Sequence, residues 1–152
     1  MILPIVHKTG LTVIRGNPAQ GKSRCIALWR QLNPQIKTMD AVLLEQEESR
    51  IPFAARLEQV SPIERILIAA DRAHAPVILL EASIDPTDPG LQGCLRGWAR
   101  KAMLYRRQII VTIMDGTLTR LHIDHYRPDL YCSWIGTYEE AAAAWKAATD
   151  AQ

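Results

Sequence analysis

Residues 11–23 read Leu-Thr-Val-Ile-Arg-Gly-Asn-Pro-Ala-Gln-Gly-Lys-Ser, and this stretch decides the fold. Its first five residues are rich in β-branched and apolar side chains, which predicts a short strand. A glycine-containing loop follows at residues 16–23, and residues 22–32 have the pattern of a helix. In this order, strand, loop and helix form the context in which a G-x-x-x-x-G-K-[ST] motif binds phosphate.

Each residue type in the loop suits that chemistry. Gly16 and Gly21 let the backbone bring its N–H groups close to a polyphosphate, and the positive end of the following helix adds to the anion site. Lys22 is expected to reach the β- and γ-phosphates, and the Ser23 hydroxyl to bind Mg²⁺. The candidate nucleotide-binding residues are Gly16, Asn17, Pro18, Ala19, Gln20, Gly21, Lys22, Ser23 and Arg24.

The composition is that of a globular protein. The 152 residues are 48% hydrophobic and 22% charged, which predicts one domain over residues 1–152. A net charge of +2 does not by itself demand a nucleic acid or a membrane. There is no apolar run of membrane-spanning length and no charged leader, and the three cysteines are far apart. These features predict a cytoplasmic protein with reduced thiols.

Strands and helices are expected to alternate along the chain. The expected strands span residues 11–15, 40–44, 76–80, 108–114, 117–123 and 130–135. The expected helices span residues 22–32, 62–74, 91–107 and 138–148, with Ser61 and Thr137 as N-caps of capping boxes. Apolar strands joined through helices indicate an α/β fold, a three-layer α/β/α arrangement with a mainly parallel central sheet.

In such a sheet the ligand lies at the carboxyl ends of the strands. This placement brings the residues that follow each apolar run towards the glycine loop. They are Glu81, the segment after Met114 and the acidic residues 45–48.

Through Gly16, Gly21, Lys22 and Ser23, which match the Walker A motif, the chain resembles the P-loop NTPase superfamily. The resemblance implies binding of ATP with Mg²⁺ and the activity of a P-loop ATPase. It also implies a Walker B element, an apolar strand that ends in an acid. Residues 77–82, Val-Ile-Leu-Leu-Glu-Ala, are the best match, and Glu81 is the acid.

Two alignments of Glu81 are open. Many motor-type ATPases end this strand in Asp-Glu-Ala, and if Glu81-Ala82 matches Glu-Ala, then Leu80 stands where the metal-binding Asp belongs. Alternatively, Glu81 is the metal-side carboxylate and no separate base is visible. Both alignments depart from the family pattern and predict slow or absent hydrolysis. The candidate metal ligands are Ser23 and Glu81.

The later half resembles the RecA-like, additional-strand ATPases of filamentous-phage assembly (the zonula occludens toxin type) and of conjugative DNA transfer. In those proteins an arginine-rich helix follows the acid-ended strand and precedes a buried strand that ends in a polar sensor. The corresponding cations here are Arg96, Arg100, Lys101, Arg106 and Arg107. The sensor would fall near Thr112 or Asp115, where the usual Gln or Asn is absent. The resemblance implies a role in plasmid or phage DNA maintenance, transfer or packaging.

The arginine-rich segment has three interpretations. Arg96, Arg100 and Arg107 fall near one helical face, which could contact the phosphates of DNA. Arg106 or Arg107 could also act in trans in a homo-oligomer or larger assembly. Alternatively, this face is simply solvated, opposite the packing side of the helix. The candidate catalytic residues are Lys22, Glu81, Arg106 and Arg107.

Two other functions are open. A small-molecule kinase fits the length of the chain, with the arginine-rich segment as a lid, although Ala19 stands where such kinases usually carry a further Gly. A nucleotide-gated regulatory subunit with little hydrolysis fits the missing Walker B aspartate. The absence of an Asn-Lys-x-Asp motif favours ATP over GTP.

Overall fold

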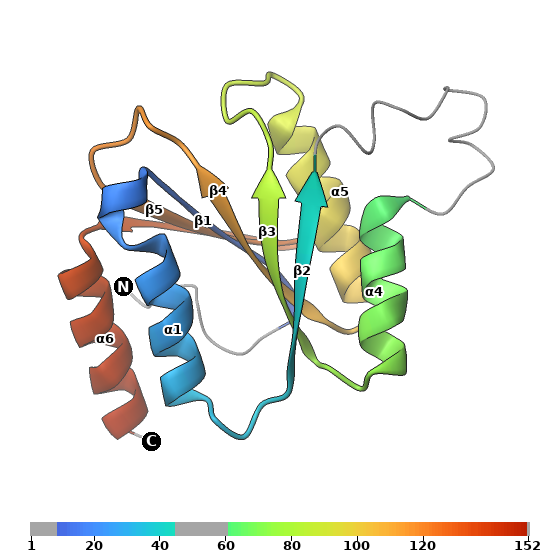
Figure 1. Cartoon of the computed structure of the whole chain (residues 1–152), viewed down its shortest axis with the longest axis horizontal. Coiled ribbons are helices and arrows are strands. Elements are labelled where there is room, and N and C mark those ends of the chain that lie inside the picture. The colour runs from blue at the N-terminus through green and yellow to red at the C-terminus, as the bar shows by residue number, and fades with distance from the viewer. Residues whose placement is uncertain (1–8, 45–60, 152) are drawn as a thin grey trace.

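The computed structural model describes residues 9–44 and 61–151 (Figure 1). Its described strands are β1 (Gly10–Gly16), β2 (Thr38–Leu44), β3 (Val77–Ser83), β4 (Gln108–Met114), β5 (Leu121–Arg127) and β6 (Leu130–Gly136). Its described helices are α1 (Lys22–Leu32), α4 (Pro62–Arg72), α5 (Leu91–Leu104) and α6 (Tyr138–Asp150), with a 3₁₀ turn η1 (Pro18–Gln20). The acidic residues 45–48 and the N-terminal residues 1–8 lie outside the described part.

The six strands form one sheet in the order β2-β3-β4-β1-β5-β6. The first four strands of this order run parallel to one another, and β5 and β6 add an antiparallel hairpin at the β1 side. The predicted α/β fold with a mainly parallel sheet is therefore confirmed. Because β4 lies between β1 and β3, the strand that enters the glycine loop does not pair with the strand that carries Glu81.

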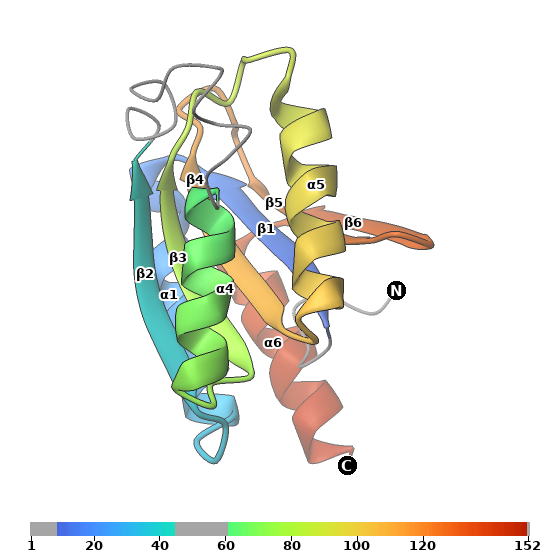
Figure 2. The ribbon, with the colours of Figure 1, turned by 90° about the vertical axis from the view of Figure 1, so that its right-hand side faces the viewer.

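Helices lie on both faces of the sheet. Figures 1 and 2 show α1 and α6 against one face and α4 and α5 against the other. Ile109 packs in the core cluster on the α5 side, whereas its neighbour Ile110 packs in the cluster on the α1 side. Successive residues of a strand point to opposite faces, so a strand covered on both faces has apolar residues at successive positions. This explains the apolar run Ile109–Val111 of β4.

Helix α5 ends earlier than predicted. Its last residue is Leu104, and Arg106 adopts a left-handed φ of 54°. The Arg106 N–H donates to Met103 O at 3.1 Å and the Arg107 N–H to Ala102 O at 2.9 Å, which is the Schellman pattern of a helix end. Arg106 and Arg107 therefore lie beyond the helix. The prediction that Arg107 shares a helical face with Arg96 and Arg100 is wrong.

The strand expected at residues 117–123 is displaced towards the C-terminus, because a turn occupies its first residues. Asp115 Oδ1 accepts bonds from the Thr117 backbone N–H at 3.1 Å and from the Thr117 hydroxyl at 2.6 Å. These bonds give the backbone an alternative to strand pairing. Strand β5 begins only at Leu121.

Candidate functional site

The glycine loop, residues 16–23, is closed by its own lysine. Lys22 Nζ donates to the carbonyl oxygen of Gly16 at 2.7 Å and to that of Asn17 at 3.0 Å. The ammonium thus joins the end of β1 to the start of α1. Partial burial lowers the pKa of Lys22. The two bonds hold the intervening backbone as a compact ring.

A second set of bonds fixes the base of the loop. The Asn17 side chain accepts a bond from Ala19 N–H at 2.9 Å, and Gln20 Oε1 accepts one from Asn17 N–H at 3.0 Å. The side-chain amides of Asn17 and Gln20 both donate to the carbonyl oxygen of Leu118, at 3.2 and 2.8 Å. The turn between β4 and β5 is therefore tied to the loop.

The start of α1 presents backbone donors. Gly21 has a left-handed φ of 90°, and the first helical bond runs from Cys25 N–H to Gly21 O at 2.9 Å. The N–H groups of residues 22–24 precede that bond, and no side chain in the described part of the protein caps this end. Free N–H groups at a helix N-terminus, together with the helix dipole, favour an anion.

A cleft of about 1230 Å³ opens beside these donors. It lies at the carboxyl ends of β3 and β4, on the α1 face of the sheet. These strand ends are at the upper edge of the sheet in Figure 1. Ser23, Glu81 and Thr112 are among the residues that line it. The expectation that Glu81 lies at the same edge of the sheet as the loop is met.

The strand register places Glu81 on the α1 face. Glu81 is aligned with Val42 of β2 on one side and Thr112 of β4 on the other. Thr112 is in turn aligned with Ile14, which packs in the α1-side cluster. Leu80 points the other way, is 2% exposed and packs in the α5-side core. Both residues contribute to the lining of the cleft, and Glu81 is the one of the pair that offers a carboxylate there.

The two sensor positions differ in their surroundings. Thr112 lines the cleft, and it is aligned with Glu81 on the neighbouring strand. Asp115 is 6% exposed, and its N–H donates to Gly16 O at 2.9 Å. Hydrogen bonding to Thr117 lowers the pKa of Asp115 against the opposing effect of burial. Thr112 is thus the residue placed to contact a ligand, while Asp115 supports the loop.

The structure does not bring all the candidate residues together. Those that line the cleft are Pro18, Ala19, Gly21, Lys22, Ser23, Arg24 and Glu81. Gly16, Asn17 and Gln20 support the loop through the bonds described above. The Arg24 guanidinium lies over the Tyr138 ring of α6, 3.9 Å from the ring centroid.

Arg106 and Arg107 lie at the opposite edge of the sheet. The Arg107 carbonyl accepts a bond from Gly10, the first residue of β1, whereas the glycine loop begins at Gly16, the last. Six strand steps separate these ends by roughly 20 Å. Arg107 is paired with Asp71 at 2.9 Å, and its side chain is 15% exposed. Neither arginine can reach the cleft of its own protomer.

Two supporting features of the loop were not predicted. Asn17-Pro18-Ala19-Gln20 forms a capping box, with Asn17 as the N-cap and Pro18 as the first residue of the 3₁₀ turn. The same spacing occurs in Ser61-Pro62-Ile63-Glu64, at the start of α4. The spacing was thus a usable signal for the loop. The Leu118 carbonyl had no signal, since any residue supplies that group.

No protein-family model matches this chain, and no curated protein matches it either. Over the described residues, no helix has both the length and the apolar character needed to cross a membrane.

Proposed function

We propose that this chain is a P-loop protein that binds ATP with Mg²⁺ in the cleft beside residues 16–23. We further propose that it hydrolyses ATP slowly, as part of a nucleic-acid-related process such as plasmid or phage DNA maintenance, transfer or packaging. The observation that carries the nucleotide site is the closure of the loop by Lys22, with the uncapped start of α1 beside the cleft.

The arrangement of the sheet supports the same assignment. Helices on both faces and the loop at the carboxyl end of β1 fit a three-layer P-loop fold. In this sheet β4 lies between β1, which enters the loop, and β3, which carries Glu81.

The donor set fits a magnesium nucleotide. The backbone N–H groups of residues 22–24 and the Lys22 ammonium suit the β- and γ-phosphates. Ser23 and Glu81 offer oxygen ligands of the kind that Mg²⁺ prefers, and the ion would neutralise phosphate charge. Glu81 would either bind the Mg²⁺ ion or orient the attacking water.

Slow hydrolysis follows from the scarcity of carboxylates. Among the described residues, only Asp40 and Glu81 bring a carboxylate to the cleft, and Asp40 is already paired with Arg30. One free carboxylate cannot act both as metal ligand and as base. The same observation favours, as the second candidate, a regulatory subunit that binds nucleotide and hardly hydrolyses it.

An arginine acting in trans would come from a neighbouring subunit. Arg106 is exposed, whereas Arg107 is held by Asp71. We therefore assign this role to Arg106 within a homo-oligomer or larger cytoplasmic assembly. Its effect would depend on protein concentration, because a monomer cannot supply it to its own cleft.

The test is to measure ATP binding and turnover side by side in the wild type, Lys22→Ala and Glu81→Gln. Lys22→Ala should weaken binding roughly ten- to hundredfold, because a charged hydrogen-bond donor is lost. Glu81→Gln should retain binding and lower turnover about a hundredfold. Arg65→Ala, on the exposed surface of α4, is the matched control.

Unchanged nucleotide affinity in Lys22→Ala would overturn the nucleotide site. Equal turnover in the wild type, Lys22→Ala and Glu81→Gln, with binding lost only in Lys22→Ala, would assign the chain to the regulatory class. Transfer of the γ-phosphate to a metabolite rather than to water would assign it to the kinases.

A further inference from the structure

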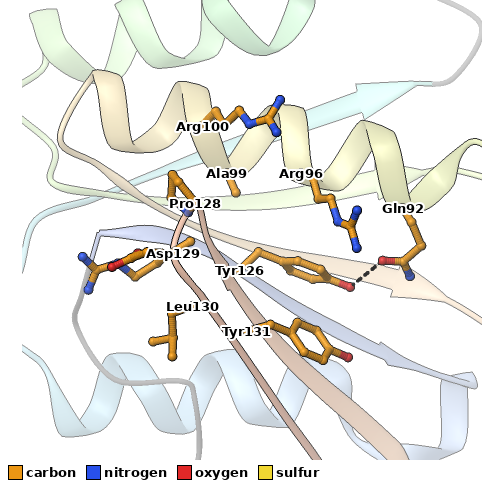
Figure 3. A pocket seen from close by; sticks show the side chains of 10 residues that line it. Gln92, Arg96, Ala99, Arg100, Tyr126, Pro128, Asp129, Leu130 and Tyr131 are labelled. Atoms are coloured by element: carbon orange, nitrogen blue, oxygen red, sulfur yellow. Dashed lines mark hydrogen bonds and ion pairs between the residues drawn. The ribbon is translucent and has the colours of Figure 1, made fainter.

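A second hollow, of about 700 Å³, lies between α5 and the β5–β6 hairpin (Figure 3). We name it the α5–hairpin groove. Arg96 and Arg100 of α5 and Arg127, Tyr126 and Tyr131 of the hairpin line it. Helix α5 covers the face of the sheet opposite α1 (Figure 2). The groove and the nucleotide cleft therefore open on opposite faces of the sheet.

We propose that the α5–hairpin groove binds a segment of single-stranded nucleic acid. A backbone phosphate would lie on Arg96, with Arg100 at the rim, and a base would stack on Tyr131. The inference rests on the proposed nucleic-acid-related function, to which it adds the form of the strand and the residues that recognise it.

The charge of the groove is unbalanced. Arg127 Nε lies 3.6 Å from Asp129 Oδ1, so this cation has a partner. Arg96 and Arg100 are both exposed, and neither has an ion pair with any described residue. Two arginines one helical turn apart, free to bind, are suited to a chain of phosphates.

The floor of the groove is aromatic. The rings of Tyr126 and Tyr131 are tilted by 52°, with centroids 5.2 Å apart. Tyr126 is 5% exposed, whereas Tyr131 is 60% exposed, so the outer ring has a free surface. Burial raises the pKa of both tyrosines, and the nearby Asp124 raises it further. The floor therefore stays uncharged and does not repel a phosphate.

The exposed ring is held in place from beneath. The Tyr131 hydroxyl donates to Asp124 Oδ1 at 2.8 Å, and Arg15 donates to Asp124 Oδ2 at 3.1 Å. Asp124 itself is 1% exposed. A ring fixed before binding loses little conformational freedom when a ligand stacks on it. Figure 3 shows Arg96 reaching from α5 towards the two tyrosines, so one nucleotide could meet both.

The combination selects a single strand over a duplex. In a duplex the bases stack on one another, so a protein surface is offered mainly phosphates and groove edges. An aromatic side chain can stack only on a base that is unstacked, and cationic grooves with aromatic rings are typical of single-strand binding.

The test measures fluorescence anisotropy of a labelled oligothymidylate of about 20 nucleotides, and of a duplex of equal length, without ATP. The single strand should bind about tenfold more tightly than the duplex. Tyr131→Ala and Arg96→Ala should each weaken binding of the single strand about tenfold. Tyr131→Phe keeps the ring and should stay within about threefold of the wild type. Arg65→Ala removes an exposed arginine outside the groove and should have little effect.

Equal or tighter binding of the duplex would overturn the inference, as would equal losses in Arg96→Ala and Arg65→Ala. ATP binding is measured on the same variants and should match that of the wild type. If neither oligonucleotide binds while ATP does, this groove proposal fails and the nucleotide site stands. If ATP binding alone is absent, the nucleotide site fails and the groove stands.

Discussion

Arg15, the residue directly before the first glycine of the loop, places its Nη2 3.1 Å from Asp124 Oδ2. Asp124 is 1% exposed, and Arg15 is the cation paired with this buried side chain. Removing one member of a buried pair leaves an uncompensated charge, which costs more than the pair itself contributes.

Arg15→Met should therefore lower the free energy of unfolding by about 3 kcal/mol, as measured by urea denaturation. The matched control is Arg30→Met, which breaks an exposed pair with Asp40 and should cost less than about 1 kcal/mol. Equal losses of unfolding free energy in the two variants would show that Arg15 does not stabilise the buried Asp124 side chain.

Gly21→Ala should weaken both folding and ATP binding. A side chain at a φ of 90° is strained, and the new Cβ would lie 3.2 Å from Tyr138 Cβ. We expect a loss of about 1–2 kcal/mol in unfolding free energy, together with weaker binding of a fluorescent ATP analogue. Gly97→Ala is the control, because Gly97 lies inside α5 and, apart from its chain neighbours and its own helix backbone, no described residue has an atom within 4 Å of the added Cβ. The free energy of unfolding of that variant should rise by up to about 1 kcal/mol.

The Asp115 carboxylate should contribute a pH-dependent part of the stability. Its pKa is lowered in the folded protein, first through the Thr117 hydroxyl. A lowered pKa stabilises the fold above the ordinary value of 3.8 and loses this effect as the pH falls through the folded value. The stability lost in Thr117→Val should therefore shrink as the pH is lowered from about 5 towards 3.

Carbon-13 NMR titration provides the direct measurement. Thr117→Val should raise the pKa of Asp115 towards its ordinary value. Thr87→Val is the matched control, since Asp85 accepts the same two bonds from Thr87 on an exposed loop. That change should raise the pKa of Asp85 and leave that of Asp115 unaltered. A shift of Asp115 in both variants would contradict the local origin of the effect.

Cys25 should resist thiol reagents in the folded protein. It is buried on α1, and burial raises its pKa to about 12. At pH 8 only about one thiol in ten thousand would be ionised. In a Cys94→Ser, Cys132→Ser variant, a disulfide reagent should react only after denaturant is added. Fast reaction of the native variant would mean that α1 opens readily and exposes Cys25.

The loop and its flanking elements could be predicted because their signals are local. Residues 11–32 carry a strand, two glycines and a helix in sequence, and the Thr137–Glu140 capping box opens α6 as expected. The place of Glu81 followed from the general rule that parallel strands end at one edge. These predictions needed no knowledge of partners distant in the chain.

The features that were misplaced or missed have no sequence signal. Helix α5 ends at Leu104, and no glycine marks the left-handed residue Arg106 beyond it. The α5–hairpin groove is lined by residues of α5 and by residues of the hairpin about 30 positions later. Hydrophobic periodicity reports only on neighbours within one element, so it does not indicate this contact. No sequence pattern indicates that the Tyr131 hydroxyl donates to Asp124, the bond that fixes the exposed ring.

The glycine loop depends on residues made much later during synthesis. The Leu118 carbonyl that receives the Asn17 amide lies 101 positions further along the chain, and β1 is inserted between β4 and β5. When β1 leaves the ribosome, neither of its neighbouring strands exists. Such long-range pairing is slow and exposes unpaired strand edges in the meantime. A nascent chain should therefore acquire affinity for nucleotide only after β5 has emerged, in a single late step.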